Sequence, residues 1–306
     1  MKKLLMIFLF LSSMVNAQHI RLVDTGDNIV FLEEKDTILV YQASAKSLAG
    51  KFERVNYIHP LYSLDGDILT QDFPKDHLHH RGIFWAWHQI YIGDKSMGDG
   101  WELKDMHWQV RTIEFVQQAD GASGIKVNVD WLSPKWTEET GLEVPFIMEE
   151  TRITARPKKK NHRFIDVEVK LFALEPDVSL GGSEDEKGYG GFSPRFVLPE
   201  DVSFTGPGGN VEPKNTPVKS EGWIDVSGTF GESQKKTGVA IFAHPDNPGF
   251  PNPWILRKKA SMQNAVYPYP GRRPVVLLRD EPLVLRYRLV VHDPGVDLNK
   301  LYRNYK

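Results

Sequence analysis

The stretch 72–88 holds four of the protein's ten histidines, together with an arginine, two tryptophans and two aspartates. Histidine has an unperturbed pKa near neutrality, so a cluster of it points to acid–base chemistry or to ligand binding. In an extended chain His77 and His79 would share one face, and His80 would lie on the other. The plain alternative is a polar loop that leads into a buried aromatic strand over 83–87. We favour a catalytic or ligand-binding site.

Three other segments set polar side chains among apolar residues. Tyr57 and His59 lie upstream of the cluster, where the next residue is a proline that fixes the chain. Arg195 follows the glycine-rich stretch 188–191, and its apolar neighbours imply that it needs an anionic partner. His244 follows an apolar strand and opens a proline-rich loop. Turn chemistry for the glycines and strand ends for the histidines are the plain alternatives.

The composition excludes several classes of protein. Cysteine is absent, which rules out thiol catalysis, iron–sulfur clusters and thiolate zinc sites. Removing Lys2 and Lys3 with a leader peptide takes the basic residues from 38 to 36, against 40 acidic residues, so the net charge is about −4. A nucleic-acid-binding protein needs a basic excess, so we expect no nucleic-acid partner.

Residues 1–17 have the organisation of a secretory signal peptide. A short basic start precedes an apolar segment over 4–15, and a Val-Asn-Ala cleavage site ends at Ala17. The apolar segment is too short to cross a membrane, and no other stretch approaches that length. We therefore predict a periplasmic or secreted protein without a membrane span, whose mature chain begins near Gln18.

The hydrophobic pattern is that of β-strands. Apolar residues alternate with polar ones over 125–131, 165–171 and 283–291, which is the period of a sheet with one buried face. Further strands are expected at 37–42, 108–116, 148–156, 223–227 and 238–243. A helical segment is expected only at 296–305. The pattern predicts one domain over 18–306, all-β and built as a large antiparallel β-sandwich with a short C-terminal helix.

Several of these segments together resemble the PmoA-like family of exported bacterial proteins, and the similarity runs from about Tyr57 to Asn264. The segments are Tyr57–Pro60, Asp76–Gly82 with Trp85 and Trp87, Glu150 with Arg152, Gly191–Arg195, and His244 through Asn247 to Trp254 and Arg257. The resemblance implies a galactose-mutarotase-like β-supersandwich. It also implies a carbohydrate ligand and a role in polysaccharide degradation.

One reaction suits histidine, arginine and tyrosine without a metal or a thiol, namely β-elimination from a uronic acid. A base removes the proton next to the carboxylate, arginines neutralise that carboxylate, and an acid protonates the departing oxygen. The enzyme is a dehydratase if water leaves and a polysaccharide lyase if a sugar leaves. We predict His80 and His244 as the acid–base pair, with His79 and Tyr57 in support.

The substrate is then an oligosaccharide, and its uronic acid makes it anionic. The residues predicted to bind it are Arg81, Arg195 and Arg257 as carboxylate clamps, with Trp87, Trp254 and Asn247 as further contacts. No cofactor is required for this chemistry. The sequence does not specify the sugar, the leaving group or the oligomeric state.

Three alternatives stay open. A mutarotase or epimerase would pair a histidine with a carboxylate base such as Glu150, for which a cross-strand partner to Arg152 or Lys170 is the plainer role. A metalloenzyme would bind a divalent metal through His77 and His79. Its further ligands would come from His59, His88, His244, Asp72 or Asp76. A non-catalytic glycan-binding protein would use Trp85, Trp87, Trp101 and Trp254 as platforms.

Overall fold

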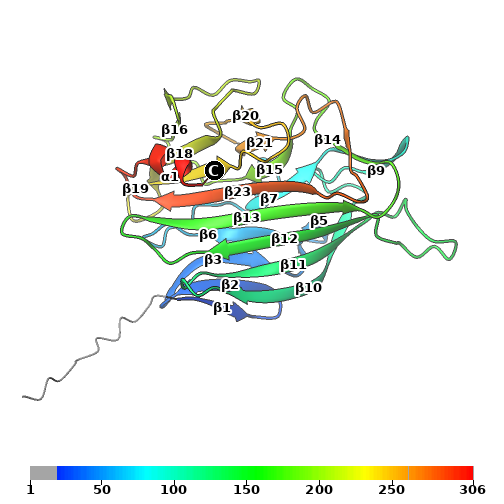
Figure 1. Cartoon of the computed structure of the whole chain (residues 1–306), viewed down its shortest axis with the longest axis horizontal. Coiled ribbons are helices and arrows are strands. Elements are labelled where there is room, and N and C mark those ends of the chain that lie inside the picture. The colour runs from blue at the N-terminus through cyan, green and yellow to red at the C-terminus, as the bar shows by residue number, and fades with distance from the viewer. Residues whose placement is uncertain (1–18, 261, 306) are drawn as a thin grey trace, which may run out of the picture.

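The computed structural model describes residues 19–260 and 262–305, which form antiparallel strands and one short helix (Figure 1). The all-β prediction is therefore confirmed. The predicted signal peptide lies outside the described residues, so export and the start of the mature chain stay predictions.

The first sheet has eight strands and joins the N-terminal part of the chain to strands far along it. In spatial order its strands are β1 (Ile20–Asp24), β2 (Asn28–Glu33), β3 (Asp36–Gln42), β6 (Tyr57–Leu61), β7 (Ile83–Trp87), β15 (Gly190–Pro194), β21 (Asn264–Val266) and β20 (Trp254–Ile255). Because β7 pairs antiparallel with β15, Ile83 lies opposite Pro194 and Trp87 lies opposite Gly190. The histidines that precede β7 therefore lie beside Arg195, and the glycine-rich segment lies beside the end of β7.

The second sheet has nine strands. In spatial order they are β10 (His107–Gln117), β11 (Ser123–Leu132), β12 (Ile147–Ala155), β13 (His162–Ala173), β23 (Leu283–His292), β19 (Lys235–Ala243), β18 (Trp223–Phe230), β16 (Ser203–Gly206) and β17 (Gly209–Asn210). The predicted alternation is confirmed, because β13 buries every second residue along its whole length. Ile165, Val167, Val169 and Leu171 lie on the buried face, whereas Asp166, Glu168 and Lys170 lie on the outer face.

Smaller elements border the two large sheets. A four-stranded sheet contains β22 (Val275–Val276), β14 (Val178–Gly181), β8 (Gln89–Ile92) and β9 (Lys95–Gly98), and a separate hairpin contains β4 (Lys46–Leu48) and β5 (Lys51–Arg54). The predicted C-terminal helix is confirmed as α1 (Leu298–Arg303). The side chain of Asp297 caps it by accepting a hydrogen bond from the amide of Lys300 at 2.9 Å.

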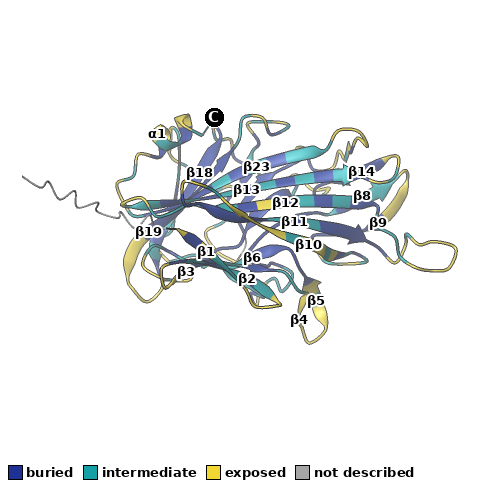
Figure 2. Ribbon diagram, turned by 60° about the horizontal axis from the view of Figure 1, so that its bottom comes forward, coloured by how far each residue is buried: buried dark blue, intermediate teal, exposed yellow. Residues whose placement is uncertain are grey.

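The core lies between the two large sheets. Trp85 and Trp87 of β7 and Trp131 of β11 belong to one buried cluster, and the rings of Trp87 and Trp131 are 5.9 Å apart. Figure 2 shows that exposed residues gather in the loops and in the β4–β5 hairpin. Because strand side chains alternate, β7 also presents a second face, away from this core.

Candidate active site

The histidine stretch forms two successive turns before β7. The amide of His77 donates to the carbonyl of Pro74 at 3.0 Å, and the amide of His80 donates to the carbonyl of His77 at 2.9 Å. The turns stack the His77 and His80 rings, whose centroids are 4.6 Å apart and whose planes differ by 1°. The alternation expected of an extended segment is therefore wrong, because hydrogen bonds between residues three apart fold the segment back on itself.

The two faces of strand β7 carry different residues, with site residues on the outer face and core residues on the inner face. Phe84 lies on the outer face, where its ring is 6.4 Å from that of His80. Trp85 and Trp87 point the other way, and the Trp87 ring is fully buried. Trp254 of β20 is also fully buried. Neither Trp87 nor Trp254 offers a ring face to a ligand here, so both have a packing role.

Trp101, from the loop after β9, covers the outer face of β7. Its ring lies 5.6 Å from Phe84, 6.2 Å from His80 and 5.2 Å from His88, against which it stacks. Tyr189 packs on it at 5.3 Å from the segment before β15. This aromatic layer forms the floor of the site and joins the histidines to the glycine-rich segment.

Three partly exposed histidines at this site each direct Nδ1 toward a carboxylate of their own. The pairs are His77 with Asp76 at 2.8 Å, His79 with Glu102 at 3.3 Å, and His88 with Asp99 at 2.9 Å. A carboxylate beside Nδ1 places a ring proton there, because an ionised carboxylate only accepts. Each ring is thereby oriented, and Nε2 is left for proton transfer or for a ligand.

The environment of His79 suits a general base. Burial, together with the positive charges of His77 and Arg54, lowers its pKa to about 4. The ring is therefore neutral at pH 7, and with a proton on Nδ1 facing Glu102 it carries a lone pair on Nε2. The side chain retains 12% of its exposure, so solvent still reaches it.

His80 is enclosed by the same cluster. It is 3% exposed, and its Nδ1 accepts a hydrogen bond from Nη1 of Arg195 at 3.2 Å. Because an arginine can only donate, the ring proton lies on Nε2. Burial and the charges of His79, His77 and Arg195 hold the pKa of His80 well below its usual range. These contacts make His80 a support for the neighbouring rings.

Arg195 has the anionic partner that its apolar neighbours implied. Nη2 donates to both oxygens of Asp76, at 2.8 and 2.9 Å, and Nε donates to Oε1 of Gln71 at 3.0 Å. The residue is 3% exposed. Its donors are thus used within the protein, where they fix Asp76 and His80, rather than left free for a substrate carboxylate.

Arg81 and Tyr57 are also enclosed. Arg81 is fully buried and donates to Asp72 at 2.5 Å, to the carbonyls of Lys46 and Phe52 at 3.0 and 2.6 Å, and to the Tyr57 hydroxyl at 2.5 Å. Burial, with the charge of Asp72, raises the pKa of Tyr57 above its usual value. The pair anchors the β4–β5 hairpin to the first sheet, and neither side chain is exposed to a substrate.

His59 of β6 lies beside this anchor. Its Nδ1 is 3.0 Å from the hydroxyl of Thr70, and burial lowers its pKa to about 4. The carboxylate of Asp72 acts in the opposite direction but does not outweigh burial.

Arg257 lies at the other end of the aromatic layer and is partly exposed. Its guanidinium is 5.8 Å from the Tyr189 ring and donates to the carbonyls of Lys214, Asn215 and Leu256. In the described part of the chain no carboxylate pairs with it. Arg81 and Arg195 already pair with carboxylates of the protein. Of the three predicted arginine clamps, Arg257 alone is left to pair with a substrate carboxylate.

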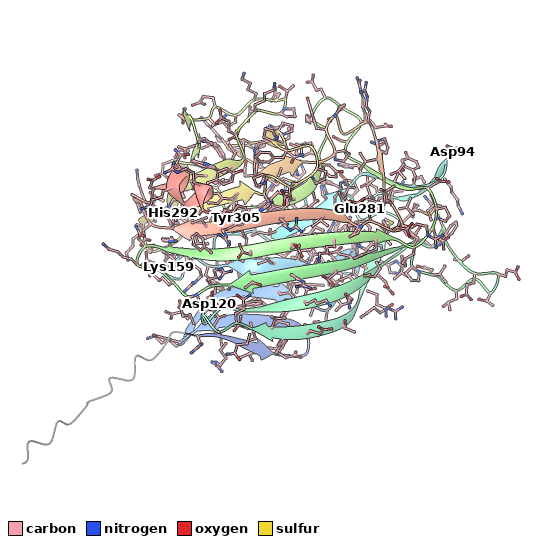
Figure 3. The ribbon with its side chains drawn as sticks, viewed as in Figure 1. Asp94, Asp120, Lys159, Glu281, His292 and Tyr305 are labelled. Atoms are coloured by element: carbon pink, nitrogen blue, oxygen red, sulfur yellow. The ribbon has the colours of Figure 1, made fainter. Side chains whose placement is uncertain are left out.

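The structure does not bring His244 and Asn247 to the histidine cluster. The His244 ring meets Tyr305 at 5.2 Å. Tyr305 lies over the outer face of the second sheet (Figure 3). Asn247 is 3% exposed and exchanges two hydrogen bonds with the backbone of Arg286, at 2.9 and 2.7 Å. Within residues 19–260 and 262–305 no contact joins His244 to His80, so the two do not form an acid–base pair.

A cavity of about 400 Å³ opens beside the cluster. His88 and Asp99 line it, together with Lys104 and with Lys135, which pairs with Asp105 at 2.9 Å. Lys104 forms no ion pair with any described residue. The cavity thus places a free cation near an oriented histidine.

Sequence reasoning missed several of these residues, chiefly Asp99, Glu102, Lys104 and Arg54. Arg54 is buried between the rings of Phe84 and Trp108, at 4.7 and 4.9 Å, and burial lowers its pKa to about 9. The available signal was the run of Asp99, Trp101 and Glu102, which directly follows the β8–β9 hairpin of the structure.

The structure also shows where the residues of the mutarotase and metalloenzyme alternatives lie. Glu150 faces outward on β12 and pairs with Lys126 and Lys170, each at 3.2 Å. Its plainer prediction, a cross-strand partner, is confirmed by the direct register of Glu150 with Lys170. For a metal, the rings of His77 and His79 are 5.7 Å apart, and the described residues hold no group of three or more acidic or histidine side chains that could bind one.

Fold and site together define an all-β protein of two facing antiparallel sheets, with a histidine–carboxylate site on the outer face of one sheet. The chain belongs to DUF6807, a family of unknown function, whose model matches residues 29–305. This match does not confirm the PmoA-like name. No curated protein matches the chain. In the part that the structure describes, no helix is long and apolar enough to cross a membrane.

Two solved structures resemble the chain at low identity. One is a "putative mutarotase (YeaD)" from Salmonella typhimurium, with 10% identity over 89% of this chain and 90% of that chain, and a TM-score of 0.36. The other is the GH36 alpha-galactosidase AgaA from Geobacillus stearothermophilus in complex with stachyose. It is 9% identical over 90% of this chain and 41% of that chain, also with a TM-score of 0.36.

Proposed function

We propose that this protein is a carbohydrate-active carbon–oxygen lyase that eliminates water or a sugar from a uronic-acid-containing oligosaccharide. The observation that supports it best is the set of three histidines, each held through Nδ1 by its own carboxylate. A base oriented by a third group is the arrangement that proton-transfer enzymes use. Two such groups on one surface are what an elimination needs.

In this proposal His79 is the base. Nε2 of His79 removes the proton on the carbon next to the substrate carboxylate, and the electrons of that bond form the new carbon–carbon double bond. The bond to the leaving oxygen breaks, and His88, protonated and held by Asp99, returns a proton to that oxygen. The products are a 4,5-unsaturated uronide and either water or a sugar.

The substrate carboxylate must be neutralised for this proton to become acidic. Arg257 and Lys104 are partly or fully exposed cations near the site, and neither has a carboxylate partner among the described residues. Arg81, Arg195, Tyr57 and His80 are buried behind the reactive rings, so in this proposal they position and do not react.

The test is turnover of a panel of uronic-acid oligosaccharides, followed by absorbance at the ultraviolet edge and by mass spectrometry. We expect an unsaturated product, and we expect His79→Asn to lower turnover at least about a hundredfold. The matched control is His107→Asn, because His107 also pairs with a carboxylate, Glu143 at 3.1 Å, but lies on β10. We expect that variant to retain full activity.

Two results would reject the elimination. One is the absence of unsaturated product with every uronide of the panel. The other is faster exchange of sugar anomers in proton NMR without any new product, which would favour the mutarotase alternative instead. An equal loss of activity in His79→Asn and His107→Asn would remove His79 from its proposed role.

A further inference from the structure

A second cavity, of about 820 Å³, lies beside β20 and β21, at the end of the first sheet. Its walls are mainly apolar rings, contributed by Tyr267, Tyr269, Pro248, Pro251, Pro253 and Pro268. The volume is within the range of small-molecule sites. None of these residues takes part in the histidine site.

Tyr269 is the more accessible of the two tyrosine rings that line this cavity. It is 52% exposed, whereas Tyr267 beside it is 7% exposed. Val275 of β22 adds a further apolar side chain to the lining. A flat, exposed tyrosine ring at a cavity is a platform for the apolar face of a sugar.

The rim of the cavity is polar and carries both signs of charge. Lys219 and Glu221 contribute to the lining, and neither forms an ion pair with a described residue. An ammonium group donates hydrogen bonds and a carboxylate accepts them, so the two can bind neighbouring hydroxyl groups. One positive and one negative charge favour a neutral ligand over an anionic one.

The cavity is joined to the histidine site by one short segment. The amide of Tyr267 donates to the carbonyl of Gly190 at 3.0 Å, and a side chain placed at Gly188 would meet Cδ2 of the Tyr269 ring at 3.6 Å. Tyr189, between these glycines, packs on Trp101 in the floor of the site. A chain of sugar units that leaves the histidine site past Tyr189 would therefore meet the Tyr269 ring.

We propose that this cavity binds a neutral pyranose unit, stacked on Tyr269, of the oligosaccharide whose uronic acid lies at the histidine site. The choice of a sugar as ligand rests on the proposed function. The site itself rests on the ring-lined cavity, its mixed-charge rim and its connection through 188–190.

The experiment titrates the full-length mature protein with neutral tetrasaccharides, namely cellotetraose, xylotetraose, mannotetraose and laminaritetraose, by isothermal calorimetry and ligand-observed NMR. We expect at least one to bind, and Tyr269→Ala to weaken that binding about tenfold or more. Tyr269→Phe keeps the ring and should keep the affinity. Phe115→Ala is the matched control, because Phe115 is also 52% exposed but lies on β10.

The outcomes separate this proposal from the lyase proposal, because neutral sugars contain no uronic acid to eliminate. The subsite is rejected if none of the four sugars binds, or if Tyr269→Ala and Phe115→Ala weaken binding equally. It is also rejected if His79→Asn abolishes the binding and Tyr269→Ala does not. Binding that depends on Tyr269 supports the subsite even if every uronide remains unchanged.

Discussion

His79 and His80 are neighbours in the sequence but have different surroundings. His79 faces a carboxylate and keeps some exposure, whereas His80 is closed off by Arg195 and by the rings around it. Burial lowers the pKa of both, so both rings are neutral at pH 7. Of these two histidines, only His79 combines a neutral ring with access to solvent, which is why we assign the base to it.

This assignment predicts an unusual pH profile. With a pKa of about 4, His79 stays in its basic form well below neutrality. We expect kcat/KM to change less than about twofold between about pH 7.5 and about pH 5 on account of this group, whereas an unperturbed histidine would lose roughly thirtyfold. Steady-state kinetics on uronide substrates would measure it, with the folded fraction checked at each pH. An acid limb near the ordinary histidine pKa, about 6.5, would contradict the assignment.

Strand β12 shows how one element gives adjacent residues opposite roles. Glu149 points into the core and accepts hydrogen bonds from Asn56 at 2.6 Å, Trp85 at 2.8 Å and Trp131 at 2.9 Å, and from Thr151. Burial raises the pKa of Glu149, and these hydrogen bonds act against that rise. The carboxylate therefore joins the two sheets through a fully used set of acceptors.

Replacing Glu149 with glutamine should lower the free energy of unfolding by about 1–3 kcal/mol. The NH₂ group of the glutamine would face the N–H of Trp131 or one of the other donors, and an NH₂ group cannot accept a hydrogen bond from them. Glu150→Gln is the matched control from the outward face, where partly exposed ion pairs contribute roughly 0–1 kcal/mol. Urea denaturation of the two variants measures the difference. Equal effects of the two substitutions would show that the buried network adds no stability.

Strand β15 explains the glycine-rich segment. A side chain at Gly190 would come within 3.0 Å of Gly182, and one at Gly188 would come within 2.9 Å of the amide of Gly271. The glycines thus allow backbone segments to approach each other closely, a packing role that differs from the turn chemistry considered from the sequence.

At the scale of the whole molecule, the first sheet carries several histidines that are neutral when folded. Burial lowers the pKa of His59 and His79 to about 4, and that of His80 well below its usual range. The pKa of His292, in the second sheet, shifts in the opposite direction. Burial lowers its pKa, but the hydrogen bond and charge of Asp225 outweigh that effect and raise it.

These shifts predict acid sensitivity. As pH falls below about 6.5, the unfolded chain binds protons that folded His59, His79 and His80 exclude, so stability falls toward pH 4. The stability that His292 contributes through its raised pKa is already fully present below about pH 6.5, so it does not offset this loss. The urea concentration at the midpoint of unfolding should fall as the pH is lowered from about 6.5 to about 4. His59→Gln should reduce the slope of stability against pH by close to one proton. A midpoint that is constant or rises on acidification would contradict the burial of these rings.

Much of the fold could be predicted from the sequence. Strong alternation over 125–131, 165–171 and 283–291 identified β11, β13 and β23, because a strand with one buried face must repeat every two residues. The site was predicted only in part. His79 and Arg257 lie at the candidate site with usable groups. His244 belongs to another surface, because it follows the buried Ala243 of β19 and lies on the outer face of the second sheet.

The sequence by itself determined the all-β class, the exclusion of thiol chemistry and the location of the histidine-rich stretch. These depend on composition and on local periodicity. Only the tertiary structure decided which polar groups remain available. The guanidinium of Arg81 donates its hydrogen bonds to Lys46, Phe52, Tyr57 and Asp72, which strand pairing brings together from distant positions. Burial and partner choice are properties of that assembly, so no local pattern contains them.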